Sequence, residues 1–464
     1  MATHTSDSLA HGHNQSPREN AGDPLVQQYL RSHQRSLEAH RTASGHFAAH
    51  GATHAVRVAD PFRPYITHAA GSRKWDLDGN EYIDYAVGHG ALLLGHGHPA
   101  VVDAVQEQAS RGVHFGENHE LELRWAALIA GMMPIAERIE FCAAGQEANL
   151  LAMRLARIHT GRRRVLRFAR NYHGWADGLV ALGAPGSVTA EITEVPFNDR
   201  AAIERELATE SYALLLTEGG GAHMSGQVPI DLQLQRDLPE LAGKHGTLYC
   251  VDEVVTGFRD APGGWQELVG IKPDLASIGK CAGGGLPMGA LVGRAELFEP
   301  LSPASPAERL VIHAGTWNAN PLAAAAGVAA CSLYRSGEPQ QQAHHAARLF
   351  RAKGNEMLKR LGVSARLHGR SIVHLYLGPV EREQYDADFA GPSTNVDWLE
   401  GVAYAAVARR LRLHLLQRGI AALRGGLYVF SAAHTAEDVD TTVSALEQSL
   451  VAMTEEGTLP TELQ

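Results

Sequence analysis

Short apolar runs alternate with helix-like stretches between about residues 136 and 293. Apolar residues recur at helical spacing in 146–159 and 231–246, which predicts two helices. Gly246 is suited to cap the second helix at its C-terminus. The apolar runs are RIEFC (138–142), RVLRF (164–168), YALLLTE (212–218), TLYCVDEV (247–254), LASIG (275–279) and ALVG (290–293). This alternation predicts an α/β fold, with a mainly parallel central sheet that carries helices on both faces.

The chain changes character after about residue 330. Ala- and Arg-rich helical sequence follows, with strand-like segments at 371–378 and 427–433, so we expect a smaller α+β domain there. A chain of 464 residues is long enough for two folding units. We expect four parts: a loose tail (1–25), an N-terminal segment (26–90), a large domain (91–330) and a small C-terminal domain (331–464).

Composition excludes several classes of function. A formal net charge of −10 argues against nucleic-acid binding, which needs clustered cations. No apolar run reaches the roughly 20 residues of a membrane span, and the polar N-terminus has no signal-peptide core. The four cysteines are widely spaced and form no CxxC pair, which indicates reduced thiols in a cytoplasmic protein.

Histidines in the N-terminal tail are the one group that could suggest a metal. His4, His11 and His13 lie in a stretch rich in Ser, Asn and Pro, and that composition favours a disordered tail. We therefore predict no metal site.

Lys280 has an unusual setting. The chain has six lysines against 35 arginines, and only Lys280 ends an apolar strand and enters a run of three glycines. Burial of an amine lowers its pKa and makes it a good nucleophile toward a carbonyl group. The alternative is a lysine that extends from the strand end into water.

Asp252 ends the preceding apolar strand. Ligands of parallel sheets bind beyond the carboxyl ends of the strands, where Glu218 and Asp252 also fall. An ionised acid there needs a cationic partner, and the protonated nitrogen of a pyridine ring would serve. The alternative, a carboxylate that caps a helix, does not explain the lysine at the next strand end.

Two further segments could bind parts of a flat, phosphorylated ligand. Gly145 and Gln146 lie where a strand gives way to a helix, and free backbone N–H groups at such a junction favour a phosphate. Tyr172 and His173 follow a strand, beside Gly174, and an aromatic ring there could stack on a heterocycle. Each signal is weak alone, since such junctions and aromatic core residues are common.

Three motifs occur in one order: DEVVTGFR (252–259), GKCAGGGLP (279–287) and HAGTWNANP (313–321). Together they resemble the signature of the class III aminotransferases, pyridoxal 5'-phosphate enzymes of fold type I. The resemblance extends from about Asp76 to residue 440. YHGWADG (172–178) and GHGALLLGHGHPAV (88–101) are similar to the glutamate-1-semialdehyde aminomutase branch of that family.

The resemblance implies roles around the cofactor ring. Lys280 would bind the cofactor covalently and move the proton of the substrate Cα. Asp252 would pair with the pyridinium nitrogen. Val254 would pack against one face of the ring, and Tyr172 would stack on the other.

It also implies contacts at the edges of the cofactor. Gly145 and Gln146 would bind the phosphate, and Thr316 would reach the phosphate of a neighbouring subunit, which implies a homodimer with shared sites. Glu218 and His223 would lie near the hydroxyl side of the ring.

The chain departs from the family pattern at two places. Ala144-Gly145-Gln146 replaces the usual Ser-Gly-Thr, so the phosphate loses two hydroxyl donors, of which the Gln amide could replace one. Gly219 replaces a proline after Glu218, which makes that loop more flexible.

Arginines suggest the substrate class. By the resemblance, Arg424 binds a substrate carboxylate, and Arg57 is a second candidate; a bidentate guanidinium–carboxylate contact suits that role. Either arginine could instead form a surface ion pair. The stretch 181–199 lacks the mobile lid of the aminomutases.

We expect a transaminase that moves an amino group between an amino acid and a 2-oxo acid by a ping-pong mechanism. The alternative is a glutamate-1-semialdehyde-type aminomutase. A dinucleotide-binding oxidoreductase fits poorly, because the glycines at 283–285 follow a lysine and no acidic residue sits at the ribose position. A pyridoxal-fold protein without catalysis stays open, given the altered phosphate loop.

Overall fold

The computed structural model describes residues 22–49 and 51–464. Most of the expected tail, with His4, His11 and His13, lies outside the described residues. The first described helix is α2 (Pro24–Ser32), and Asp23 begins it by accepting hydrogen bonds from the backbone N–H groups of Leu25 and Val26.

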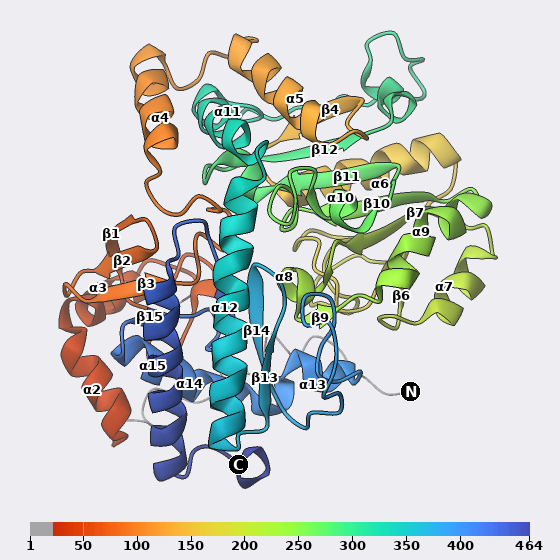
Figure 1. The fold of residues 1–464 in the computed structure, drawn as a ribbon. Coiled ribbons are helices and arrows are strands. Elements are labelled where there is room, and N and C mark those ends of the chain that lie inside the picture. The colour runs from red at the N-terminus through yellow and green to blue at the C-terminus, as the bar shows by residue number, and fades with distance from the viewer. Residues whose placement is uncertain (1–21, 50) are drawn as a thin grey trace.

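A seven-stranded sheet forms the centre of the molecule, in the order β4-β12-β11-β10-β7-β5-β6 (Figure 1). Its strands are β4 (Arg138–Cys142), β5 (Arg164–Phe168), β6 (Ile192–Val195), β7 (Tyr212–Glu218), β10 (Leu248–Glu253), β11 (Leu275–Gly279) and β12 (Gly289–Gly293). The five strands from β11 to β6 are parallel, and β12 is antiparallel to both of its neighbours. The expectation of a mainly parallel sheet is confirmed.

Both faces of the sheet are covered because the strands are apolar on both sides. Leu214 and Leu216 of β7 pack into a core with α6 (Gly145–Thr160), whereas Leu215 belongs to the core on the opposite face. That second core contains residues of α9 (Leu232–Lys244) and α10 (Gly264–Val269). Alternate residues of a strand point to opposite faces, so an uninterrupted apolar run requires helices on both.

The helix expected at 231–246 is α9, and Gly246 follows its end. His245 is the cap residue, and Gly246 has a φ of +64°, the left-handed conformation that glycine adopts most easily. The chain then enters β10.

The N-terminal part of the chain pairs with the C-terminal part. β1 (Ile66–Ala70), β2 (Arg73–Asp76) and β3 (Glu81–Asp84) form a sheet with β15 (Ile420–Ala421), which is parallel to β3. A second, antiparallel sheet contains β13 (Ala365–His368), β14 (Ile372–Leu377) and β16 (Leu427–Val429). The strands expected at 371–378 and 427–433 are thus present, the latter ending earlier than expected.

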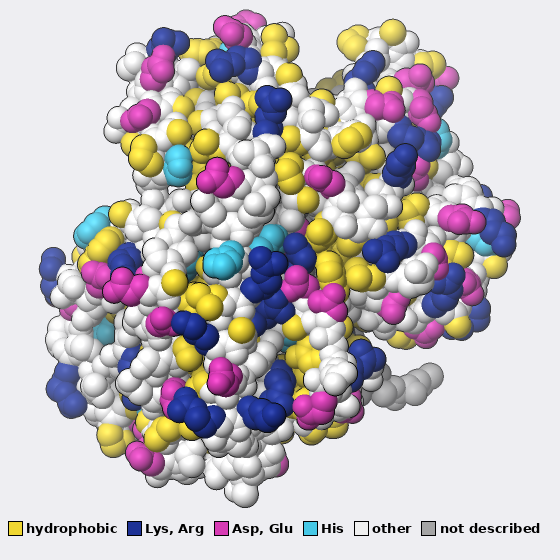
Figure 2. All heavy atoms as spheres, in the orientation of Figure 1, with side chains coloured by type: hydrophobic (Ala, Val, Ile, Leu, Met, Phe, Trp, Pro, Cys, Tyr) yellow, Lys and Arg dark blue, Asp and Glu magenta, His cyan; other side chains and the backbone are white. Residues whose placement is uncertain are grey.

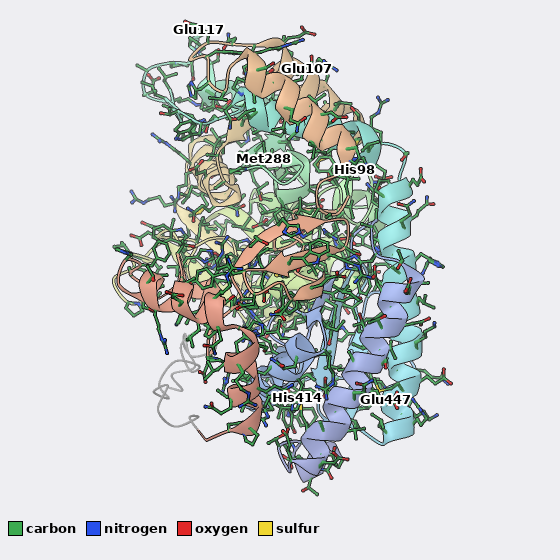
Figure 3. All side chains as sticks on the ribbon, turned by 90° about the vertical axis from the view of Figure 1, so that its left-hand side faces the viewer. His98, Glu107, Glu117, Met288, His414 and Glu447 are labelled. Carbon is green, nitrogen blue, oxygen red and sulfur yellow. The ribbon has the colours of Figure 1, made fainter. Side chains whose placement is uncertain are left out.

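Helices complete both halves. α4 (Pro99–Arg111) and α5 (Glu120–Met132) pack against α11 (Pro321–Tyr334). The long helices α12 (Glu338–Leu361) and α15 (Ala436–Glu455) run side by side, and Arg360 of α12 donates to Glu447 of α15 at 3.0 Å (Figure 3). Two shorter helices, α13 (Val396–Glu400) and α14 (Ala405–Gln417), lie between β14 and β15 in the chain.

Acidic and basic side chains are interspersed over most of the face drawn in Figure 2. In the described part of the chain, no helix has both the length and the apolar character needed to cross a membrane.

Candidate active site

Asp252 lies near the carboxyl end of β10, the expected ligand edge of the sheet. Its carboxylate accepts hydrogen bonds from Asn149 Nδ2 (2.7 Å), His173 Nδ1 (2.8 Å) and the backbone N–H of Val254 (3.0 Å). Burial alone would raise the pKa of Asp252, but the contact with His173 and the other hydrogen bonds lower it below its usual value. The carboxylate is therefore ionised at neutral pH and held in one orientation.

Asn149 completes this arrangement and was not predicted from the sequence. Its Nδ2 also donates to the backbone carbonyl of His173 at 2.9 Å, so one amide fixes both the acid and its histidine partner. Asn149 is fully buried on the inner face of α6, among alanines and leucines. A lone amide on the apolar face of an expected helix was the signal that could have identified it.

Lys280 directly follows β11 and begins a short 3-10 helix (Lys280–Gly283). Burial lowers the pKa of Lys280, whereas the charges of Asp252 and Glu218 act in the opposite direction. Its backbone has a φ of 44°, which is uncommon for a residue with a side chain. The amine thus lies in the same buried cluster as the Asp252 carboxylate.

The glycine run after Lys280 is explained by close packing. A Cβ at Gly284 would lie 2.7 Å from the carbonyl oxygen of Ala326, and one at Gly285 would lie 2.5 Å from Leu92 Cδ2. Both residues also have positive φ values. The run therefore lets the segment after Lys280 lie directly against α11 and the 88–92 turn.

The junction between β4 and α6 leaves backbone donors free for an anion. Ala144 precedes the helix and gives it no side-chain cap, and the dipole of α6 favours negative charge there. A Cβ at Gly145 would lie 2.5 Å from Val254 Cγ2, so Val254 packs directly on Gly145. Gln146 Oε1 accepts from the backbone N–H of Trp175 at 3.3 Å, which leaves its Nε2 as a donor.

Tyr172 and Glu218 meet at the ends of β5 and β7. The backbone N–H of Tyr172 donates to Glu218 Oε1 at 2.5 Å. Burial raises the pKa of Glu218 well above its usual value. The side chain of Tyr172 is 57% exposed, so its ring is free to stack on a flat ligand.

His223 and Arg424 lie close to each other. His223 Nε2 donates to Glu400 Oε1 of α13 at 2.8 Å, and Arg170 also pairs with Glu400. Burial, followed by the charges of Arg424 and Arg170, lowers the pKa of His223 to about 4, so the ring is neutral at pH 7. Arg424 is exposed and has a φ of 52° in the turn before β16.

Arg57 lies in the short helix η1 (Ala55–Arg57). It is exposed, and Thr53 Oγ1 at 3.4 Å accepts a hydrogen bond from its guanidinium. Its charge acts on His89, whose pKa is lowered to about 4 by burial first and then by Arg63, Arg57 and Lys280. His89 and Arg63 were not among the predicted site residues.

Thr316 was expected to reach the phosphate of a neighbouring subunit. It is exposed on the loop before α11, where its carbonyl accepts from His114 Nε2 at 2.5 Å. The neighbouring Trp317 is 62% exposed.

The described residues fit pyridoxal 5'-phosphate. They offer an ionised acid for a ring nitrogen, an amine of lowered pKa for an aldehyde and a helix N-terminus for a phosphate. The exposed ring of Tyr172 and the side chain of Val254 supply surfaces that could face a planar group. These groups therefore match the charges of the ring nitrogen and of the phosphate.

Comparisons with known proteins agree with this chemistry. Residues 54–370 match the model of the family Aminotransferase class-III. Glutamate-1-semialdehyde 2,1-aminomutase 2 of Brevibacillus brevis is 37% identical over 409 residues, which cover 83% of this chain and 90% of that protein.

Two solved structures are similar over almost the whole chain. A β-phenylalanine aminotransferase from Variovorax paradoxus has a TM-score of 0.80 and 26% identity, and the match covers 95% of this chain and 99% of the other. A glutamate-1-semialdehyde aminomutase from Pseudomonas aeruginosa, in complex with PMP, has a TM-score of 0.82 and 24% identity over 96% and 99% of the two chains. The chain belongs to the class III aminotransferase family and is an enzyme of fold type I whose cofactor is pyridoxal 5'-phosphate.

Proposed function

We propose that this enzyme is a transaminase that moves an amino group between an amino acid and a 2-oxo acid by a ping-pong mechanism. The observation that carries the proposal is the cluster of Asp252 and Lys280 at one sheet edge, where burial lowers the pKa of the amine. A bound pyridoxal cofactor supplies an electron sink for the bonds of the substrate Cα. The protein determines which bond reacts by where it holds the substrate.

Lys280 has two roles in this proposal. Its Nζ would hold the cofactor, and once the substrate amine had displaced it, the free neutral amine would accept the proton of the substrate Cα. The lowered pKa of Lys280 supports both roles, because only an unprotonated amine can act as nucleophile or base. Asp252, fixed by His173 and Asn149, keeps the pyridine nitrogen protonated.

The family resemblance supports the remaining cofactor contacts. Gly145 and Gln146 would bind the phosphate through backbone N–H groups and the Gln amide. Val254 and Tyr172 would pack on the two faces of the ring, and Glu218 would lie near its hydroxyl side.

Substrate carboxylates are bound by Arg424, with Arg57 as a second anchor and His223 beside Arg424. Within the described residues, neither arginine forms a salt bridge with a carboxylate, which supports a role toward a ligand over a surface ion pair. A guanidinium binds a carboxylate through two parallel hydrogen bonds, which orients the substrate as well as holding it.

An aminomutase is the second candidate, because the curated relative at 37% identity carries that name. The region 181–199 favours the transaminase, since it lacks the lid that retains an intermediate between half-reactions. Three segments, GHGALLLGHGHP, ELRWA and RGGLYVFSAAH, are similar to those of D-phenylglycine aminotransferase, which also supports transamination between two substrates.

We further propose a cytoplasmic homodimer in which Thr316 reaches the phosphate of the partner's cofactor. The exposed position of Thr316 and the exposed ring of Trp317 support a contact at this loop. Analytical ultracentrifugation tests the dimer.

Absorbance of the holoenzyme distinguishes the two reactions. A transaminase loses its yellow colour on addition of an amino donor alone and recovers it with a 2-oxo acid. An aminomutase converts a single substrate fully without any second one. Complete turnover with one substrate and no oxo acid would overturn the proposal.

A further inference from the structure

Arg259 ends the DEVVTGFR motif after β10, and the proposed reaction gives it no role. Its side chain is fully buried, and its Nε has no hydrogen-bond partner within the described residues. The acceptors of its other nitrogens are neutral, namely two backbone carbonyls and one hydroxyl. A buried guanidinium stays charged, so Arg259 places a positive charge in the interior that no carboxylate among its hydrogen-bond partners balances.

The hydrogen bonds of Arg259 join three parts of the chain. Its Nη2 donates to the carbonyl of Gly90 at 2.8 Å. Its Nη1 donates to the carbonyl of Phe430, directly after β16, at 2.9 Å and to Ser371 Oγ, directly before β14, at 3.4 Å. The guanidinium therefore fixes the turn that contains Gly90 between the central sheet and the C-terminal sheet.

That turn has a strained backbone. Val87, Gly88, His89 and Gly90 have φ values of 34°, 64°, 56° and 88°, and only the two glycines adopt this region easily. Such a conformation persists where the surrounding structure holds it. Arg259 supplies one of the hydrogen bonds that hold this turn.

The turn lies directly against Lys280. A Cβ at Gly90 would lie 3.9 Å from Lys280 Cδ. The next residue, Cys281, donates from its Sγ to the same Gly90 carbonyl at 3.3 Å. Arg259 and the segment that carries the reacting amine thus share one acceptor.

The charge of Arg259 also acts on the amine. Burial is the main cause of the lowered pKa of Lys280. The charges of Asp252 and Glu218, and then that of Cys281, act to raise this pKa, whereas the charge of Arg259 acts to lower it. Arg259 therefore opposes the two carboxylates of the site.

We propose that Arg259 is a positioning residue for Lys280, because it holds the 87–90 turn against the lysine and keeps an unbalanced positive charge near its amine. This rests on the proposed function, in which Lys280 is the reacting amine. Arg259 acts through Lys280: a nearby positive charge favours the neutral amine, which is the form that accepts a proton.

Visible absorption of the holoenzyme, measured against pH, tests the charge. The visible band reports the protonation of the nitrogen that joins Lys280 to the cofactor. Arg259→Gln removes the positive charge and should raise the pKa of this nitrogen by about 1. Arg259→Lys keeps the charge without the planar fork, so this pKa should change by less than about 0.3 while kcat falls about 10-fold.

A second pair of variants leaves Arg259 in place. Ser371→Asp puts a carboxylate beside Nη1, which balances the charge, and should raise the same pKa by about 1 as well. Ser371→Asn has nearly the same shape without the charge and should leave this pKa unchanged. The pair keeps the test decisive if Arg259→Gln does not fold.

A role in folding alone would lower stability and leave the pKa of the visible band unchanged. The same pKa in the wild-type enzyme and Ser371→Asp would therefore overturn the proposal, and so would a wild-type kcat in Arg259→Lys. A visible band that persists in Lys280→Ala would instead refute the proposed role of Lys280 itself, so the two failures are distinguishable.

Discussion

The two ends of the active site differ in how their charges are balanced. At the sheet edge, Asp252 has three hydrogen-bond donors and an amine in the same buried cluster. At the other end, Arg57, Arg63 and Arg424 have no carboxylate partner within the described residues.

The two ends therefore differ in whether the protein itself or a bound ligand balances their charges. The cofactor end is organised before any ligand binds, through hydrogen bonds that the protein supplies itself. The substrate end keeps its cations near one another, at a cost that a bound anion offsets. Substitutions at the first end should therefore reduce the rate, and those at the second should reduce affinity.

The largest effect is expected for Lys280→Ala. Removing the amine that binds the cofactor and moves the Cα proton should lower kcat by about 10⁴-fold or more. Steady-state kinetics measure the loss, and Lys272→Ala, at an exposed lysine, is the matched control. A variant that keeps a tenth of the activity would exclude Lys280 as the reacting amine.

A smaller loss is expected for Asp252→Asn. The amide keeps the shape but removes the charge that protonates the ring nitrogen, so kcat should fall about 10²- to 10³-fold. His173→Gln leaves the acid in place but removes a hydrogen bond that holds it, so its kcat should fall less than that of Asp252→Asn. An equal fall in kcat for the two variants would show that the charge of Asp252 does not determine the rate.

Arg424→Gln should act on affinity. We expect KM for carboxylate substrates to rise about 10- to 100-fold while kcat changes little, because a bidentate contact is lost from both the ground state and the transition state. Initial rates over a range of substrate concentrations measure both constants. Unchanged kinetics would remove Arg424 from the site.

The smallest effect concerns the pH dependence of stability. The pKa of His89 is lowered from 6.5, the value of an unperturbed histidine, to about 4 in the folded protein. As pH falls, the unfolded chain therefore binds a proton at this residue before the folded protein does. Stability should therefore decrease between pH 6.5 and 5 by about 1–2 kcal/mol. His89→Gln should show a decrease that is smaller by about this amount in urea unfolding of the two proteins, because His223 and other buried histidines contribute separately.

The cofactor end was predictable from the sequence because its residues follow strand ends. In a parallel sheet these ends meet at one edge, so Asp252, Lys280 and Glu218 had to come together. The antiparallel direction of β12 was not predicted, since a short apolar run carries no direction. Asn149 was missed because its function depends on a contact across the helix–sheet interface.

The substrate end was only partly predictable. Arg424 and Arg57 came from family resemblance, not from local pattern. Arg63 and His89 lie in irregular segments before β1 and after β3, so their positions depend on how these strands pair. Long-range pairing of this kind leaves no periodic signal in the sequence.

The most direct test of the central claim is borohydride reduction of the holoenzyme followed by peptide mapping. Reduction makes the bond between the cofactor and its lysine permanent, so mass spectrometry can locate it. We predict one labelled peptide, with the label on Lys280 and none on the other five lysines. A label elsewhere, or no labelled peptide, would contradict the assignment of the active site.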